Sequence, residues 1–196
     1  MFSPLRLPLY LTAGFMALKA TVFKATLNIT DLDRQYYQSH TLTLARHPSE
    51  TDERMMIRLL AFALHAEEYL AFGQGMTDDN EADLWLKDLT GAITLWIDVG
   101  IPDEKLIRKA CGRADKVVVY SYGGRVAEMW FTQNKSQFAR QDNLSIIDIT
   151  QESTQALAAM AQRNMDLQCT IQDGQIWLND GTHNVEVLRE TRQLAK

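Results

Sequence analysis

Apolar and polar residues alternate along the chain from residue 21 onward. Residues 21–29 read TVFKATLNI, and residues 36–45 alternate again after a polar turn at 31–34. A period of two is typical of a strand that buries one of its faces. Two such runs separated by a short polar turn predict an antiparallel hairpin.

The pattern changes to helical spacing after residues 47–52, which read HPSETD. Ser49, followed three positions later by Asp52, predicts a capping box at a helix start. The apolar residues that follow share one helical face: Met56, Leu59, Leu60, Ala63 and Leu64. We expect this helix to be the longest element and to end at the glycines at 73 and 75.

Short strands and helices follow one another in the rest of the chain. We expect strands over 83–87 and 93–99 around a turn at Gly91, a helix over 102–114 and a buried strand over 116–120. The pair Gly123-Gly124 predicts a hairpin turn into a strand over 126–131. A strand over 144–149, a helix over 151–162 and a terminal meander over 167–171, 176–178 and 185–188 complete the prediction. This order predicts an α/β (α+β) chain with a central mixed sheet, flanking helices and additional antiparallel strands at both ends.

Composition excludes several classes of protein. The 196 residues are 46% hydrophobic and 23% charged, which is an ordinary globular mixture and not that of a disordered or collagenous chain. The formal charge of -5 means that any contact with phosphate groups depends on a local basic patch or a bound cation. Cys111 and Cys169 form no CxxC pair, and the four histidines show no HExxH spacing, which disfavours a zinc site.

The first twenty residues, MFSPLRLPLYLTAGFMALKA, superficially resemble a secretory signal. Pro4 and Pro8 interrupt the apolar run, which is far shorter than the ~20 residues of a membrane-spanning helix. We expect Met16 to be the natural start, residues 1–15 to be a disordered or over-extended leader, and residues 16–196 to form one domain. Export of the chain is the alternative.

Charge is segregated in the middle of the chain. Residues 78–104 contain eight acids, among them Asp78 and Asp79, and a single base. Residues 105–116 contain five bases and one acid. Acids that hold a divalent cation, followed by bases that meet substrate oxygens, are typical of a metal-and-phosphate site. Solvated surface charge is the alternative for most of these residues.

Asp98 stands out among these acids because it lies in the apolar strand segment LWIDV. A buried carboxylate needs a cation, an ion pair or strong hydrogen-bond donors. If the strands over 83–87 and 93–99 pair around Gly91, Asp83 and Asp98 approach the same end of the hairpin. Two carboxylates converging there repel unless they share a cation or a proton, although a structural role for each stays open.

Several segments together carry a resemblance to a known family. They are ALKATVFKA at 17–25, LARHPSETDERMM at 44–56, Asp83-Leu-Trp, KACGRA at 109–114 and LQCTIQD at 167–173. They resemble the YaeQ family of bacterial proteins over essentially everything after Met16. The resemblance implies a fold like that of the PD-(D/E)xK nucleases, in which a mixed sheet holds two acids and a lysine around Mg²⁺. It implies an activity less directly, since one fold serves many functions.

The resemblance implies that Asp83 and Asp98 are the two acids that bind Mg²⁺. The family motif places a lysine two positions after the second acid, where this chain has Gly100. Lys109 is the preferred replacement and Lys105 the alternative, both on the helix that follows. Glu50 or Glu53 could supply a further acid, or Glu50 could simply pair with Arg54 at i,i+4 spacing.

Two functions follow as hypotheses. The first is a cytoplasmic, Mg²⁺-dependent nuclease-like phosphodiesterase, with catalytic residues Asp83, Asp98, Lys109 and Glu50. The second is a non-catalytic module that keeps the fold and binds nucleic acid or a protein partner. The missing lysine at Gly100 favours the second, and the retained acids favour the first. We expect no membrane association.

Overall fold

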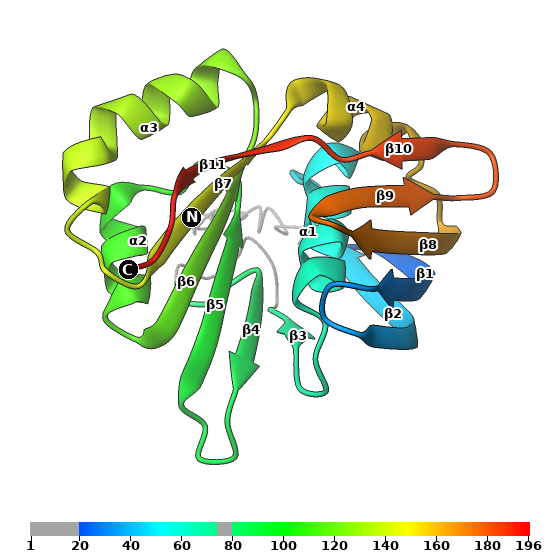
Figure 1. Cartoon of the computed structure of the whole chain (residues 1–196), viewed down its shortest axis with the longest axis horizontal. Helices are drawn as coiled ribbons and strands as arrows, with labels where there is room; N and C mark the ends of the chain where they lie inside the picture. Colours follow the sequence, from blue (N-terminus) through cyan, green and yellow to red (C-terminus); the bar gives the residue numbers. More distant parts are fainter. Residues whose placement is uncertain (1–19, 74–79) are drawn as a thin grey trace, which may run out of the picture.

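The structure is a computed structural model that describes residues 20–73 and 80–196, which form two β-sheets with helices between and around them (Figure 1). The predicted leader over 1–15, the glycine at 75 and the acids Asp78 and Asp79 lie outside the described residues. The predicted mixed α/β class is confirmed, but the described strands form two sheets instead of one central sheet.

The larger sheet has six strands in the order β11-β7-β6-β5-β4-β3. These strands are β3 (Ala71–Phe72), β4 (Leu84–Lys87), β5 (Ile93–Val99), β6 (Ala114–Ser121), β7 (Leu144–Ile149) and β11 (Arg189–Gln193). Strands β3, β4 and β5 pair antiparallel, whereas β5, β6 and β7 are parallel. Gly91, at a φ of 87°, lies in the β4–β5 turn as predicted.

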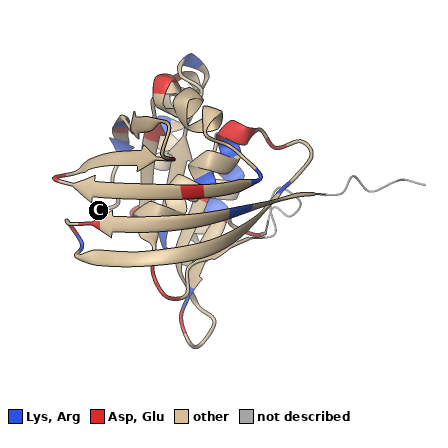
Figure 2. Ribbon diagram, turned by 90° about the vertical axis from the view of Figure 1, so that its right-hand side faces the viewer, with Lys and Arg blue, Asp and Glu red and all other residues tan. Residues whose placement is uncertain are grey.

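The smaller sheet has five strands in the order β10-β9-β8-β1-β2 (Figure 2). These strands are β1 (Thr21–Asp31), β2 (Tyr36–Arg46), β8 (Asn164–Gln172), β9 (Gln175–Asn179) and β10 (Asn184–Glu186). The antiparallel strands predicted at the two ends of the chain therefore belong to one sheet. They are joined by a parallel pairing of β1 with β8, which pattern alone does not reveal.

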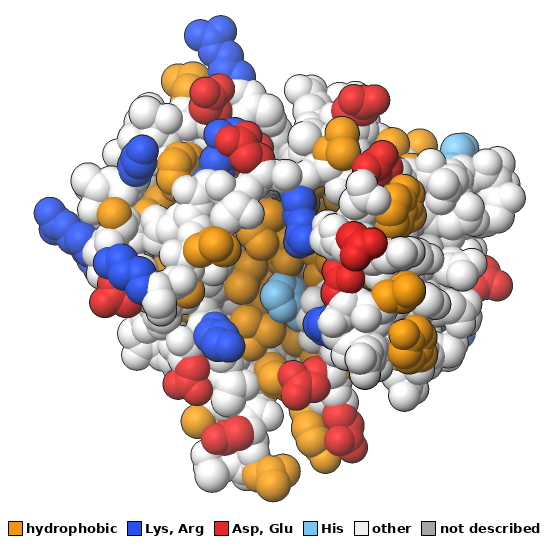
Figure 3. Space-filling view, in the orientation of Figure 1, with side chains coloured by type: hydrophobic (Ala, Val, Ile, Leu, Met, Phe, Trp, Pro, Cys, Tyr) orange, Lys and Arg blue, Asp and Glu red, His pale blue; other side chains and the backbone are white. Residues whose placement is uncertain are grey.

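Four helices complete the described part of the chain: α1 (Asp52–His65), α2 (Glu104–Cys111), α3 (Arg125–Phe138) and α4 (Gln151–Ala159). Helix α1 lies between the two sheets, and α2 and α3 cover the far face of the six-stranded sheet (Figure 1). One apolar core surrounds α1 and takes residues from both sheets, and a second lies under α2 and α3. A hollow between the sheets shows apolar side chains around a histidine (Figure 3). None of the helices in the described ranges is long and apolar enough to cross a membrane.

The structure corrects two expectations about α1. Its N-cap is Thr51, whose hydroxyl accepts from the backbone N–H of Arg54 at 3.1 Å, and not Ser49. The helix ends at His65, well before Gly73. Arg34, in the turn after β1, donates to the carbonyl of Ala63 at 3.1 Å and so satisfies one of the free carbonyls at the helix end.

The segment predicted as a strand over 126–131 is helical and belongs to α3. Its apparent alternation was misleading, because Val126 and Met129 are exposed while Ala127 and Phe138 are buried, Phe138 in the second core. Gly124, at a φ of 57°, immediately precedes the helix instead of turning a hairpin.

Candidate carboxylate site

Asp83 and Asp98 lie at the same end of the β4–β5 hairpin, as predicted. Leu84 pairs with Ile97 and Trp85 with Trp96, so the same register sets Asp83 opposite Asp98 one step beyond the paired residues. The backbone N–H of Asp83 donates to the carboxylate of Asp98. The backbone N–H of Val99, next to Asp98, donates to the carboxylate of Asp83 at 2.7 Å. The hairpin thus brings the two predicted acids together.

The cation nearest to this acid pair is Arg54 of α1. Its Nη2 atom donates to both carboxylate oxygens of Asp83, at 2.7 Å each, and its Nη1 atom donates to Glu50 at 2.9 Å. Burial opposes the charge of Arg54, but the two carboxylates outweigh burial and raise its pKa. Arg54 is therefore a fixed positive charge beside the acid pair.

Glu50 belongs to the same network, but both of its oxygens are bound by arginines. Oε1 accepts from Arg54 and from Nε of Arg58, and Oε2 accepts from Nη2 of Arg58 at 2.8 Å. Glu50 is 4% exposed and Arg58 is 1% exposed. The i,i+4 pair of Glu50 with Arg54 is present, and the contacts of Glu50 make it a residue that positions Arg54 beside Asp83.

Asp98 differs from Asp83 because no arginine binds its carboxylate among the contacts of the described residues. Burial raises the pKa of Asp98 to about 7, and repulsion from Asp83 adds to the effect. The indole N–H of Trp96, the backbone N–H of Asp83 and the charge of Arg54 lower this pKa only in part. Asp98 is thus a carboxyl group that titrates near neutral pH beside a second carboxylate, a feature that is enriched at functional sites.

The predicted lysines are placed less directly. Lys109 is exposed on α2 and donates to the side-chain oxygen of Asn80, three residues before Asp83. Gly100, where the resemblance led us to expect a lysine in nucleases of this kind, has a φ of 109°, a conformation that a side-chain-bearing residue adopts only with strain. The backbone conformation at this position therefore disfavours lysine.

Sequence reasoning named Arg54 only as the partner of Glu50. The bond from Arg54 to Asp83 joins residues 29 positions apart and depends on how α1 packs against the β4–β5 hairpin. The one available signal was the heavily charged start of the helix, ETDER, which precedes a long apolar run. No group of three or more acidic, histidine or cysteine side chains in the described ranges is arranged to hold a metal ion.

Taken together, two mixed sheets packed on a central helix, with an opposed carboxylate pair at a hairpin end, define an α/β protein with a candidate acidic site. The chain belongs to the YaeQ family: the family model described as "YaeQ protein" matches residues 16–189.

Relatives and solved structures agree with this assignment. The YaeQ protein of Escherichia coli K12 is 49% identical over 172 residues, which cover 88% of this chain and 95% of that protein. The YaeQ protein of Salmonella typhi is 46% identical over the same length. Crystal structures of YaeQ proteins from Xanthomonas axonopodis pv. citri and Pseudomonas syringae are 48% and 35% identical. Each aligns with a TM-score of 0.85 over 89% of this chain, and they are covered over 98% and 97% of their own lengths.

Proposed function

We propose that this protein is a cytoplasmic, Mg²⁺-dependent phosphodiesterase of the PD-(D/E)xK nuclease type that acts on nucleic acid. The observation that carries the proposal is the Asp83–Asp98 pair, in which Asp98 has a pKa of about 7. Two carboxylates held together at a strand end are destabilised by repulsion, and a divalent cation between them relieves it.

The donor set fits Mg²⁺ better than other metals. Mg²⁺ is a hard cation that is bound through one or two carboxylates and otherwise keeps its waters or binds substrate phosphates. Asp83 and Asp98 would hold the ion, and it would supply a bound water of lowered pKa. Neither histidine nor cysteine among the described residues joins these acids in a metal-binding group, which disfavours zinc.

The chain's own residues would bind and orient the substrate. Arg54 carries a fixed charge in a planar fork that suits phosphate oxygens, and Glu50 positions it from the other side. Arg54 thus supplies the positive charge that the missing lysine at Gly100 would supply in the family motif. Lys109 lies toward the same end of β4 through its bond to Asn80, and we propose that it contacts the substrate backbone.

The test is cleavage of supercoiled plasmid, linear duplex DNA and single-stranded RNA with Mg²⁺, Mn²⁺ or chelator. We expect the wild type to cleave at least one substrate in the presence of metal. Asp98→Asn keeps the size of the side chain but removes the charge that binds the ion, so we expect a loss of about 100-fold or more. Asp115→Asn is the matched control, because Asp115 is an exposed acid on the neighbouring strand β6.

A second readout does not depend on activity. At pH 8, Mg²⁺ should raise the melting temperature of the wild type and of Asp115→Asn but not that of Asp98→Asn, because only a protein that binds the ion is stabilised by it. Cleavage that persists unchanged in Asp98→Asn, or no cleavage of any substrate by the wild type, would contradict the proposal.

The alternative is a non-catalytic module that binds nucleic acid. The specific observation in its favour is that Arg54 already occupies both oxygens of Asp83, as a structural ion pair would. In that case Mg²⁺ leaves the melting temperature unchanged, and Lys109→Ala weakens nucleic-acid binding and lowers its salt dependence. Lys135→Ala, which removes another exposed helical lysine, on α3, is the control.

A further inference from the structure

The outward face of the five-stranded sheet holds a transverse row of amide and hydroxyl side chains. The register sets five residues side by side across all five strands: Ser39, Asn28, Gln168, Asn179 and Asn184. Residues that pair directly across strands point to the same face, so these side chains form one continuous polar strip. Figure 2 shows this sheet from its outer side, with few charged positions on the strands.

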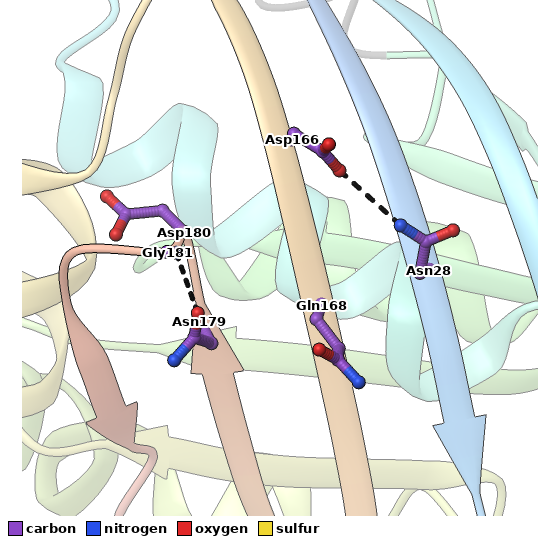
Figure 4. A pocket seen from close by; sticks show the side chains of 6 residues that line it. All are labelled: Asn28, Asp166, Gln168, Asn179, Asp180 and Gly181. Atoms are coloured by element: carbon purple, nitrogen blue, oxygen red, sulfur yellow. Dashed lines mark hydrogen bonds between the residues drawn. The ribbon is translucent and has the colours of Figure 1, made fainter.

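A cavity of about 310 Å³ lies on this strip. It is lined by Asn28 of β1, Asp166 and Gln168 of β8, Asn179 of β9, and Asp180 and Gly181 of the turn after β9 (Figure 4). This volume is at the lower end of the ~300–1,000 Å³ that is usual for small-molecule sites. It lies on the five-stranded sheet, whereas the acid pair lies at the end of the β4–β5 hairpin of the other sheet.

Within this cavity one hydrogen bond is short: the side-chain oxygen of Asn179 accepts from the backbone N–H of Gly181 at 2.7 Å (Figure 4). The other contacts between its polar side chains are weak. Asn28 donates to Asp166 at 3.4 Å and Asn179 donates to Asn184 at 3.5 Å, both at the long limit of a hydrogen bond. Within the described part of the chain, the amide of Gln168 has no hydrogen-bond partner. A ligand can therefore replace these contacts with better ones at little cost.

The charge of the cavity selects among ligands. Its lining contains two carboxylates and no lysine or arginine, which disfavours phosphate groups and nucleic acid. Asp180 is already saturated: it accepts from the backbone N–H groups of Thr182 and His183, and its other oxygen contacts the His183 ring at 2.9 Å. What remains for a ligand is the Asp166 carboxylate, the amides of Asn28 and Gln168 and the side-chain NH₂ of Asn179, which suit a neutral molecule with many hydroxyl groups.

An aromatic residue lies on the same sheet face, one outward-facing position along β9 from the lining residue Asn179. Trp177 precedes Asn179 by two residues on β9, so both side chains point outward, and Trp177 is partly exposed. The flat C–H face of a pyranose ring can pack on an indole while its hydroxyl groups bond to neighbouring amides and carboxylates. We propose that this face binds a neutral saccharide, with Trp177 under one sugar ring and Asn28, Asp166, Gln168 and Asn179 bonded to hydroxyl groups.

The test is NMR titration of the ¹⁵N-labelled full chain with maltohexaose, cellohexaose and chitohexaose. We expect at least one of them to shift the side-chain amide signals of Asn28, Gln168 and Asn179 and the indole signal of Trp177, with saturation. Gln168→Ala should weaken this binding by about tenfold, because a ligand bond is lost. Gln175→Ala is the matched control, since it removes an exposed amide from the same β9–β8 sheet face outside the cavity and should leave affinity unchanged.

Three results would overturn the proposal. The first is no shift with any of the three saccharides. The second is binding that Gln168→Ala leaves intact, or shifts confined to another surface. The third is that spermidine or an oligothymidylate shifts the same signals and the saccharides do not, which would assign the cavity to cations or to nucleic acid. The saccharide titration does not depend on metal or on cleavage, so its outcome is independent of the function proposed for the acid pair.

Discussion

Single charged residues at the acid pair are placed so that each depends on its neighbours. Arg58 is one of the largest fully buried side chains, and its guanidinium is satisfied by Glu50 and by the carbonyl of Ala45. Arg54 links Glu50 to Asp83, and Asp83 in turn repels Asp98. Removing one charged group therefore changes the electrostatic energy of the groups that remain. The effects of substitutions on stability consequently differ sharply from one residue of this network to another.

The titration of Asp98 predicts how stability depends on pH in the absence of metal. The folded pKa of about 7 exceeds the ordinary 3.8, so between these values the native state holds a proton that the unfolded chain has lost. Stability from this group is thus fully present below about pH 3.8 and is lost as the pH rises through 7. The side chain introduced by Asp98→Asn does not ionise, so the variant does not lose this stability. We expect its free energy of unfolding to exceed that of the wild type by an amount that grows by up to about 1.4 kcal/mol per pH unit between pH 4 and 7 and then levels off.

This prediction is measured by urea unfolding of wild type and Asp98→Asn from pH 4 to pH 9, in chelator. Comparing the two proteins cancels the contribution of His65, whose pKa burial lowers to about 4. A stability difference that does not vary with pH would show that Asp98 is ionised throughout this range in the native protein.

Glu50 gives the second prediction at this scale. Glu50→Gln leaves Arg58 buried without its counter-charge, so we expect the free energy of unfolding to fall by about 3 kcal/mol. Glu104→Gln breaks another i,i+4 pair, with Arg108 at 3.5 Å, but Arg108 is mostly exposed. The surface substitution should cost less than about 0.5 kcal/mol. Equal losses in urea unfolding of the two variants would contradict the view that burial makes the Glu50 network structurally essential.

At the scale of elements, short sequence patterns predicted the features that depend on neighbouring residues. The alternation in 21–29 and 36–45 predicted β1 and β2, and the β4–β5 register around Gly91 predicted that Asp83 and Asp98 meet. Contacts between distant segments were beyond the sequence. Arg34, in the β1–β2 turn, donates to a carbonyl at the end of α1, and Arg54 of α1 donates to Asp83 of a different element. Strand β1 pairs with β8, which lies about 140 positions later in the sequence. The strand predicted over 126–131 failed because six residues of a helix can imitate alternation, whereas Ala127 and Phe138 show the helical face only over a longer span.

The end of β5 carries a prediction of its own. Gly100 has a φ of 109°, and a Cβ atom there would meet only Tyr122 Cε1, at an ordinary 3.9 Å. The cost of Gly100→Ala is therefore conformational, and we expect a loss of about 1–2 kcal/mol. Gly112 ends α2 at a φ of -80°, with nearest contacts of 3.6 Å, so Gly112→Ala should change stability by less than about 0.5 kcal/mol. Urea unfolding of both variants measures the difference, and a neutral Gly100→Ala would show that the backbone at this position does not disfavour a side chain.

At the scale of the whole molecule, the two sheets are not separate folding units. The core around α1 includes Leu27 and Leu167 of the five-stranded sheet together with Ile97 and Val118 of the six-stranded sheet. The chain crosses between the sheets more than once, because β1 and β2 precede the six-stranded sheet, β8 to β10 follow most of it, and β11 returns to its edge (Figure 1). A hydrogen bond also joins α1 to the six-stranded sheet: Nε2 of His65 lies 2.8 Å from the hydroxyl oxygen of the buried Tyr120 on β6. The sheet with the carboxylate site and the sheet with the polar cavity thus share one core, and we expect them to unfold together.

This architecture predicts a single unfolding transition that both sheets share. Protein labelled with 5-fluorotryptophan reports on the five-stranded sheet through Trp177 and on the six-stranded sheet through Trp96, and ¹⁹F NMR in increasing urea should give both the same midpoint. Leu27→Ala removes a fully buried side chain from β1, so we expect a loss of about 2–5 kcal/mol that moves both midpoints together. Val22→Ala, at a half-exposed position of the same strand, should move neither. A Leu27→Ala protein in which Trp177 unfolds before Trp96 would show that the five-stranded sheet opens by itself, and that α1 does not couple the two sheets.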